Sequence, residues 1–434
     1  MAPILPLPLP RIISTSIHES TNSSSTGGEG SLTPASGADV LPAVLMPIFL
    51  VATYFLPPFR LRPFFFLVVL GLLEWGSFVS PWPPNEGDAR PLRYGITTSW
   101  IFALPVLERV CLHVPERDFW RLDPGEDWSR AKGGRPREWS WEKVWWAVRL
   151  VCTPRGVGWD LSGGKMKMTR VNGGRGIDGL GRAKYVFGCA FRAFLCYLVW
   201  DGVMLAEQKM EVPEGWAWDA STLGRIAAAE VMMVLITYCG MVMQFEGAAA
   251  IGVALYLNGP EDWPPLFGSL VDCYTVVNVW GTFWHQYIRQ PCLGISHALL
   301  RLVRLPSDRR YRPVAYFVHL LNAFVISDGF HILAVGSMAS GYVPVSSVVA
   351  DLSTFFLLQP LAGTVESIAM GLFARQKAFI NGLILALCRL AGYVWVFCWF
   401  YVTGWWFVKA YLDVRMQDWQ LPNSILKKWL FPDV

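Results

Sequence analysis

The sequence predicts an all-α integral membrane protein with about eight transmembrane helices and additional interfacial or re-entrant helices. Of its 434 residues, 53% are hydrophobic and only 16% are charged, whereas soluble domains usually carry about 25% charged residues. Aromatic residues make up 14% of the chain and include 22 Trp, and Trp and Tyr gather where a membrane meets water. We therefore expect a multi-pass protein, and we expect its membrane to be that of the endoplasmic reticulum.

The apolar runs set the expected number of spans. A helix that crosses a bilayer needs about 20 mostly apolar residues, and a shorter apolar run at 247–257 is expected to be re-entrant or interfacial. The third candidate is the weakest, because Glu108 and Arg109 interrupt it. The candidates are Val40–Leu56, Pro63–Val79, Tyr94–Val114, Tyr185–Ala206, Ile226–Phe245, Val314–Met338, Val343–Val365 and Phe379–Phe407.

Composition also predicts the domain organisation. Residues 1–38 are rich in Pro and then in Ser, Thr and Gly, which is typical of a disordered tail. Residues 39–410 then form the membrane domain, and residues 411–434 a C-terminal tail. Segments 113–184 and 285–312 carry an excess of Lys and Arg and are expected in the cytosol. The acidic connector at 207–223 and the amino terminus are then lumenal, which makes Asn22, in Asn22-Ser23-Ser24, a glycosylation candidate.

Charge and cysteine spacing exclude several classes of protein. The formal net charge is only +4, so we expect no nucleic-acid partner. Nine cysteines are scattered singly along the chain, a pattern typical neither of a metal site nor of a disulfide framework. The sequence has no repeat of fixed period and no matched pair of broken helices, which makes a transporter less expected but does not exclude one. The oligomeric state is left open.

One aromatic segment follows the fifth apolar run. The spacing predicts a helix over Val276–Gln290, amphipathic and interfacial, with aromatic side chains toward lipid and polar side chains toward the protein. Simple interfacial packing is the alternative explanation for such an aromatic stripe. The aromatic side would carry Trp280, Phe283, Trp284 and Tyr287, and the polar side Asn278, His285 and Arg289.

A second feature lies inside the span that begins at Val314. His319, Asp328 and His331 all belong to it, and ionisable residues at membrane depth are costly and are functional candidates by default. Asp328 and His331 are three residues apart, so they can meet on one helix face, where the carboxylate would orient the imidazole. A structural histidine with a local hydrogen bond is the alternative.

Four short motifs stand in a characteristic order: Pro154-Arg155-Gly156-Val157-Gly158-Trp159, Pro264-Pro265-Leu266-Phe267-Gly268-Ser269-Leu270, Trp280-Gly281-Thr282-Phe283-Trp284-His285-Gln286, and Ser327 with His331. Together they resemble the fungal wax synthase-like branch of the membrane-bound O-acyltransferases, roughly from Leu41 to Trp406, with the core at about 225–370. His113 and Asp118 have the H-x₄-D spacing of the glycerolipid acyltransferases, but the companion blocks of that family are missing.

The resemblance implies transfer of an acyl group from acyl-CoA to a hydroxyl, with acyl-CoA as a co-substrate and no bound cofactor. It implies His331 as the essential base and His285 as a second polar residue of the site. In fungal biosynthetic members the donor is commonly acetyl-CoA and the acceptor a terpenoid or meroterpenoid alcohol. A long-chain wax-ester synthase is the alternative within this chemistry, and a non-catalytic membrane transporter or scaffold is the alternative outside it.

The chemistry indicates roles for further residues. A hydroxyl needs a base as it attacks, and an imidazole with a pKa near its ordinary value of about 6.5 is suited to that task. Charge that develops on the thioester oxygen needs a hydrogen-bond donor. The oxyanion and orienting candidates are His285, Asn278, Gln286 and Asp328. The acyl-CoA-binding candidates are Trp284, Arg289, Arg301 and Arg304, for which a general positive-inside bias is the alternative.

Overall fold

The structure is a computed structural model. It describes residues 37–79, 94–95, 97–98, 100–121, 136–153, 155–160, 179–211, 218–306, 308–339, 342–374, 382–416 and 424–430. All of them belong to one unit, Gly37–Val434. The predicted tail at 1–38, apart from its last two residues, lies outside this description, and so does the glycosylation candidate Asn22.

Helices dominate the described residues, as the sequence predicts. The only strands among the described residues are a pair of two-residue antiparallel strands, β1 (Trp120–Arg121) and β2 (Trp159–Asp160). The helices are α1 (Gly37–Phe55), α2 (Arg62–Val79), α4 (Trp100–Leu112), α5 (Pro115–Asp118), α6 (Trp141–Val151), α7 (Gly179–Glu207), α8 (Ala220–Ala254), α9 (Val276–Asn278), α10 (Arg289–Leu302), α11 (Arg312–Gly336), α12 (Val345–Ala374), α13 (Gly382–Asp413) and α14 (Ile425–Leu430). Short turns are η1 (Pro260–Asp262), η2 (Leu270–Asp272), η3 (Val279–Phe283) and η4 (Arg309–Tyr311).

Five described helices are long and apolar enough to cross a membrane, so an integral membrane protein is confirmed at that level. They contain 25 to 35 residues each: Gly179–Glu207, Ala220–Ala254, Arg312–Gly336, Val345–Gly371 and Ile384–Asp413. The apolar part of α1, Val44–Phe55, is shorter, and the predicted total of eight spans is not confirmed.

Two predicted boundaries differ from the structure. The stretch at 247–257 is not a separate re-entrant segment, because α8 continues through it to Ala254. No proline follows Phe245 before that point, so nothing interrupts the hydrogen bonds along the helix. In the expected C-terminal tail, residues 411–413 close α13 and residues 425–430 form α14, which packs on α7. Asp201 of α7 accepts a hydrogen bond from the backbone N of Leu426, at 3.0 Å, at the start of α14.

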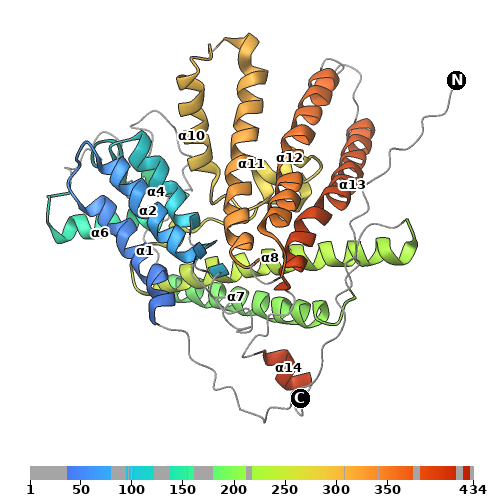
Figure 1. The fold of residues 1–434 in the computed structure, drawn as a ribbon, viewed down its shortest axis with the longest axis horizontal. Helices are drawn as coiled ribbons and strands as arrows, with labels where there is room; N and C mark the ends of the chain where they lie inside the picture. Colours follow the sequence, from blue (N-terminus) through green and yellow to red (C-terminus); the bar gives the residue numbers. More distant parts are fainter. Residues whose placement is uncertain are drawn as a thin grey trace, which may run out of the picture. The chain divides into compact units, whose positions relative to one another are not determined.

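The described helices pack in three sets (Figure 1). α7 and α8 lie side by side, α10 to α13 stand next to one another in chain order, and α1, α2, α4 and α6 pack together. The largest buried cluster joins α7 and α8 to α11, α12 and α13, and it contains Ile226, Val335, Leu352 and Val408. A second buried cluster lies among the N-terminal helices.

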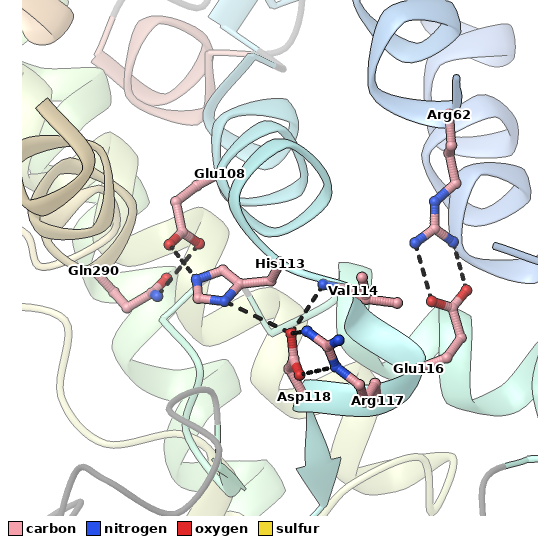
Figure 2. Close-up of polar contacts among 8 residues, drawn as sticks. All are labelled: Arg62, Glu108, His113, Val114, Glu116, Arg117, Asp118 and Gln290. Atoms are coloured by element: carbon pink, nitrogen blue, oxygen red, sulfur yellow. Dashed lines mark hydrogen bonds and ion pairs between the residues drawn. The ribbon is translucent and has the colours of Figure 1, made fainter. Parts of the chain in front are cut away.

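Polar contacts join the N-terminal helices to one another and to α10 (Figure 2). Arg62 donates two hydrogen bonds to the Glu116 carboxylate, at 2.5 and 3.0 Å, and both side chains are buried. The His113 Nε2 atom lies 3.3 Å from Glu108, and its Nδ1 atom lies 4.0 Å from Asp118. Gln290 of α10 donates to Glu108 at 3.5 Å. The H-x₄-D pair therefore belongs to a polar network that joins α4 and α5 to α10.

Candidate active site

The segment expected to be one helix over Val276–Gln290 is broken, so that prediction is wrong. α9 ends at Asn278, the π-helical turn η3 spans Val279–Phe283, and Trp284 is extended, with φ −64° and ψ 147°. The backbone N of Trp284 bonds to the Val279 carbonyl five residues earlier, at 2.6 Å. α10 begins only at Arg289, and His285 thus lies in a non-helical connection.

Gly268 of the Pro-Pro-Leu-Phe-Gly motif explains where η3 ends. Its backbone N donates to the Phe283 carbonyl at 2.9 Å, and this bond takes the place of a helical one. A Cβ atom on Gly268 would lie 2.2 Å from the Thr282 carbonyl oxygen, a distance that no side chain tolerates. Leu266 and Phe267 of the same motif are buried, and Phe267 packs on the Tyr238 ring at 4.4 Å.

The first motif joins the second in the structure. The Arg155 guanidinium donates to the carbonyl oxygens of Pro264 and Pro265, at 2.7 and 3.2 Å. Gly158 has a φ of 74°, and a Cβ atom there would lie 2.9 Å from the Asp262 carboxylate. Segments about 110 residues apart in sequence thus form one support for the η3 turn.

Trp280 points into the helix bundle, so the expectation that it faces lipid is wrong. Its ring packs against Phe324, Phe355 and Phe400, with centroid distances of 5.5, 6.1 and 5.7 Å. Its Nε1 atom donates to the Gln359 side-chain oxygen at 3.3 Å. The η3 turn is therefore anchored in the core formed by α11, α12 and α13.

His331 lies on α11 with a defined hydrogen bond. Its Nδ1 atom is 2.7 Å from the Ser327 carbonyl oxygen. Because a carbonyl oxygen only accepts, Nδ1 carries the proton, and Nε2 keeps a free lone pair. The imidazole packs on the rings of Phe356 and Phe407, at 4.8 and 5.6 Å. This tautomer is the one that can accept a proton at Nε2.

Asp328 does not make the expected bond to His331. Its Oδ2 atom accepts from the Ser353 hydroxyl of α12 at 2.7 Å, while the imidazole Nδ1 bonds to the Ser327 carbonyl instead. The backbone carbonyl four residues back lies within reach of Nδ1, and the Asp328 side chain turns toward α12. Its Oδ1 atom is buried and has no hydrogen-bond partner among the described residues.

His285 is the second histidine of the site. Its ring lies between Trp284 and Tyr287, with centroid distances of 5.9 and 6.1 Å, and its Nδ1 atom has no hydrogen-bond partner among the described residues. Burial lowers the pKa of His285 to about 3, and the charge of nearby His331 adds to the effect. The fold thus brings the two predicted histidines close enough for their charges to interact, and His285 is neutral at neutral pH.

The remaining candidates bond to other groups than the two histidines or are exposed on α10 and just after it. The Asn278 amide donates to the Asp272 carbonyl at 2.8 Å. The Gln286 amide donates to the Trp284 carbonyl at 2.7 Å, and Arg289 donates to the Gln286 side chain at 3.3 Å. Arg289 is exposed at the start of α10, and Arg301 and Arg304 are exposed near its other end.

Two polar residues of α12 near the site do not figure in the sequence prediction. Gln359 and Glu366 are both buried, with 1% and 8% of their surface exposed, and both contact the aromatic segment. Each interrupts an apolar helix, and Glu366 is the kind of intramembrane ionisable residue that marks a functional candidate. That signal was available in the sequence.

Fold and site together define the class: a multi-pass membrane protein with a pair of half-buried histidines, one on a spanning helix and one on a broken aromatic segment. The model of the membrane bound O-acyl transferase family matches residues 263–358 of the chain. Both histidines fall inside the matched range. The resemblance found in the four motifs is thereby confirmed.

Several similar proteins are fungal acetyltransferases. The chain is 28% identical over 208 residues to the acetyltransferase TRI7 of Fusarium sporotrichioides, covering 47% of this chain and 46% of that protein. It is 33% identical over 144 residues to the acetyltransferase ataH of Aspergillus terreus, covering 33% and 44%. The chain spans less than half of the length of these relatives. No solved structure matches it.

Proposed function

We propose that the protein is an acyl-CoA:alcohol O-acyltransferase that acetylates a hydroxyl of a lipophilic terpenoid or meroterpenoid, in fungal secondary metabolism. The observation that carries the proposal is the His331 tautomer, in which Nδ1 bonds to the Ser327 carbonyl at 2.7 Å and leaves Nε2 free to accept a proton. The family match over residues 263–358 and the names of the relatives support the reaction class and the acetyl donor.

In the proposed reaction, His331 Nε2 removes the hydroxyl proton as the alcohol oxygen attacks the thioester carbonyl carbon. The carbon–sulfur bond then breaks, CoA leaves as a thiolate, and the imidazolium returns the proton to that sulfur. His285 is neutral because burial lowers its pKa to about 3, so it offers one N–H to the oxygen that becomes negative. The thioester is already activated, so the step balances without a further reactant.

The two substrates differ in where they dissolve. Acyl-CoA is polar and cytosolic, whereas a terpenoid alcohol partitions into lipid, so we propose that they meet at the cytosolic boundary of the endoplasmic reticulum membrane. The exposed guanidinium groups of Arg289, Arg301 and Arg304 are the proposed contacts for the CoA phosphates. Trp284 is the proposed apolar contact for the donor.

The test is ester formation by microsomes that contain the protein. Labelled acetyl-CoA or palmitoyl-CoA is supplied with a panel of terpenoid and fatty alcohols. We expect acetyl esters, and we expect His331→Ala to lower the rate by about 10²- to 10⁴-fold, the usual share of general base catalysis. Full activity in His331→Ala would refute the assignment of the base.

A second histidine of the same helix provides the matched control. His319 lies three turns before His331 on α11, with its ring 4.8 Å from that of His297. His319→Ala is expected to keep most of the activity. Esters formed from palmitoyl-CoA alone would favour a wax-ester synthase, and the absence of any ester would favour a transporter or a scaffold.

A further inference from the structure

Glu366 of α12 holds the amino end of the segment that leads to His285. Its two carboxylate oxygens accept from the backbone N atoms of Val276 and Val277, at 2.6 and 2.9 Å. These are the first two residues of α9, whose N–H groups have no partner within the helix. A carboxylate at that position satisfies both donors and is favoured by their partial positive charge.

Gln359, two turns earlier on α12, holds the other end of the same segment. Its side-chain oxygen accepts from Trp280 Nε1 at 3.3 Å. Its Nε2 atom donates to the Phe355 carbonyl at 2.9 Å, which fixes the orientation of the amide. We call Gln359 and Glu366 the α12 clamp.

Each residue of the α12 clamp also accepts a hydrogen bond from one Trp of α13. Trp395 Nε1 donates to Glu366 at 2.7 Å, and Trp399 Nε1 donates to Gln359 at 3.0 Å. The indoles are four residues apart on α13 and the acceptors are seven apart on α12, so each pair lies on one face of its helix. One oxygen of each clamp residue, Oε1 of Glu366 and Oε1 of Gln359, thus accepts from both the aromatic segment and α13.

Glycines allow this close approach from both helices. A Cβ atom on Gly363, midway between the two clamp residues, would lie 3.2 Å from the Val277 side chain. A Cβ atom on Gly392 of α13 would lie 2.3 Å from the Tyr274 carbonyl oxygen. The backbone from Tyr274 to Trp280 therefore lies directly against α12 and α13.

We propose that Glu366 is a positioning residue of the site: by holding α9 and η3, it sets the position of His285. Among the described residues the His285 Nδ1 atom has no hydrogen-bond partner, so its position depends on ring packing and on the backbone that leads to it. Glu366, Trp395 and Trp399 all lie beyond the matched range 263–358. The kinetic part of this inference rests on the proposed function.

The kinetic test is a double-mutant cycle on the full-length protein. We expect Glu366→Gln to lower kcat about tenfold or more, with a small change in the KM for acetyl-CoA. The amide replaces one of the two acceptor oxygens by an NH2 donor, which would face a backbone N–H group instead of accepting from it. In a His285→Ala background the same change should have almost no further effect on kcat. An equal fold-loss in both backgrounds would overturn the proposal, because it would mean that Glu366 does not act through His285.

Two further variants separate positioning from general destabilisation. Glu366→Asp keeps a carboxylate and should restore part of the lost kcat. Ser367→Ala is the matched control. Among the described residues the Ser367 hydroxyl bonds only to the Gly363 carbonyl of its own helix, at 2.7 Å, so this change should leave kcat unchanged. A loss of kcat in Ser367→Ala as large as that in Glu366→Gln would contradict a specific role.

Hydrogen exchange tests the anchoring without any activity. In detergent, peptides that cover residues 276–285 should exchange faster in Glu366→Gln than in the wild type, while peptides of α7 should not change. Unchanged exchange at 276–285 would overturn the inference. A wild-type protein that forms no ester refutes the proposed function alone, and the exchange comparison still decides whether Glu366 anchors the segment.

Discussion

The replacement Gly268→Ala should disrupt the site by displacing the η3 turn. The new Cβ atom would lie 2.2 Å from the Thr282 carbonyl oxygen, and real Cβ atoms essentially never come closer than 3.0 Å, so the two segments must separate by at least 0.8 Å. Such a shift also lengthens the 2.9 Å hydrogen bond from Gly268 to Phe283. The backbone φ of Gly268 is one that other residues adopt, so the close approach alone requires glycine here.

This displacement sets the expected magnitudes. A misplacement of about 1 Å in a catalytic group costs about 10²-fold in rate, and overpacking of this kind destabilises by about 1–3 kcal/mol. Labelled acetyl-CoA in microsomes would measure the rate, and Trp fluorescence in detergent would measure the unfolding midpoint.

Gly281→Ala is the matched control, because Gly281 lies in η3 itself and has no atom within 4 Å of the position of a Cβ. It should keep both the rate and the unfolding midpoint near those of the wild type. Equal losses in the two variants, or wild-type behaviour of Gly268→Ala, would refute the reasoning.

Three further predictions concern stability. Arg62→Met leaves the Glu116 carboxylate buried without its partner and should destabilise by about 3–5 kcal/mol; thermal unfolding in detergent should show a smaller loss when Glu116→Leu is added, and an equal or larger loss would contradict this. Asp201→Ala removes the acceptor at the start of α14, at a cost of about 1 kcal/mol, so limited proteolysis should cleave the carboxyl end faster; an unchanged cleavage rate would be evidence against that anchor. Burial lowers the pKa of His285 to about 3, so the unfolded state binds more protons than the native state between about pH 6.5 and 3. The contribution of His285 to the free energy of unfolding is therefore fully present above about pH 6.5 and is lost as the pH falls below it. The unfolding midpoint of His285→Gln should therefore fall less between pH 7 and pH 5 than that of the wild type, and equal falls would contradict the shift.

The sequence alone predicted the spanning helices α7, α8, α11, α12 and α13. Each contains a long apolar run, and the length and hydropathy of a run are local properties that need no knowledge of packing. The same holds for His331, because an ionisable residue inside an apolar run stands out against its neighbours.

The break after Phe283 could not be predicted from local sequence patterns. The aromatic spacing of residues 276–290 fits a helix, but hydrogen bonds from Gly268 and to Glu366 decide the backbone path there. Both partners lie outside residues 276–290, so the periodicity within the segment gives no information about them. The contact of Asp328 was mispredicted for the same reason, since Ser353 belongs to another helix.

The sequence by itself thus determined that the chain is a helical membrane protein, which motifs it carries, and that two histidines are candidates for its chemistry. The tertiary structure decided how those motifs meet: Arg155 binds the carbonyls of Pro264 and Pro265, Gly268 ends η3, and α12 holds the segment that carries His285. The physical reason is that the tendency of a segment to enter a membrane depends on its own composition, which can be read from the local sequence. Hydrogen bonds between distant backbone and side-chain groups depend on which helices become neighbours, and only folding sets that.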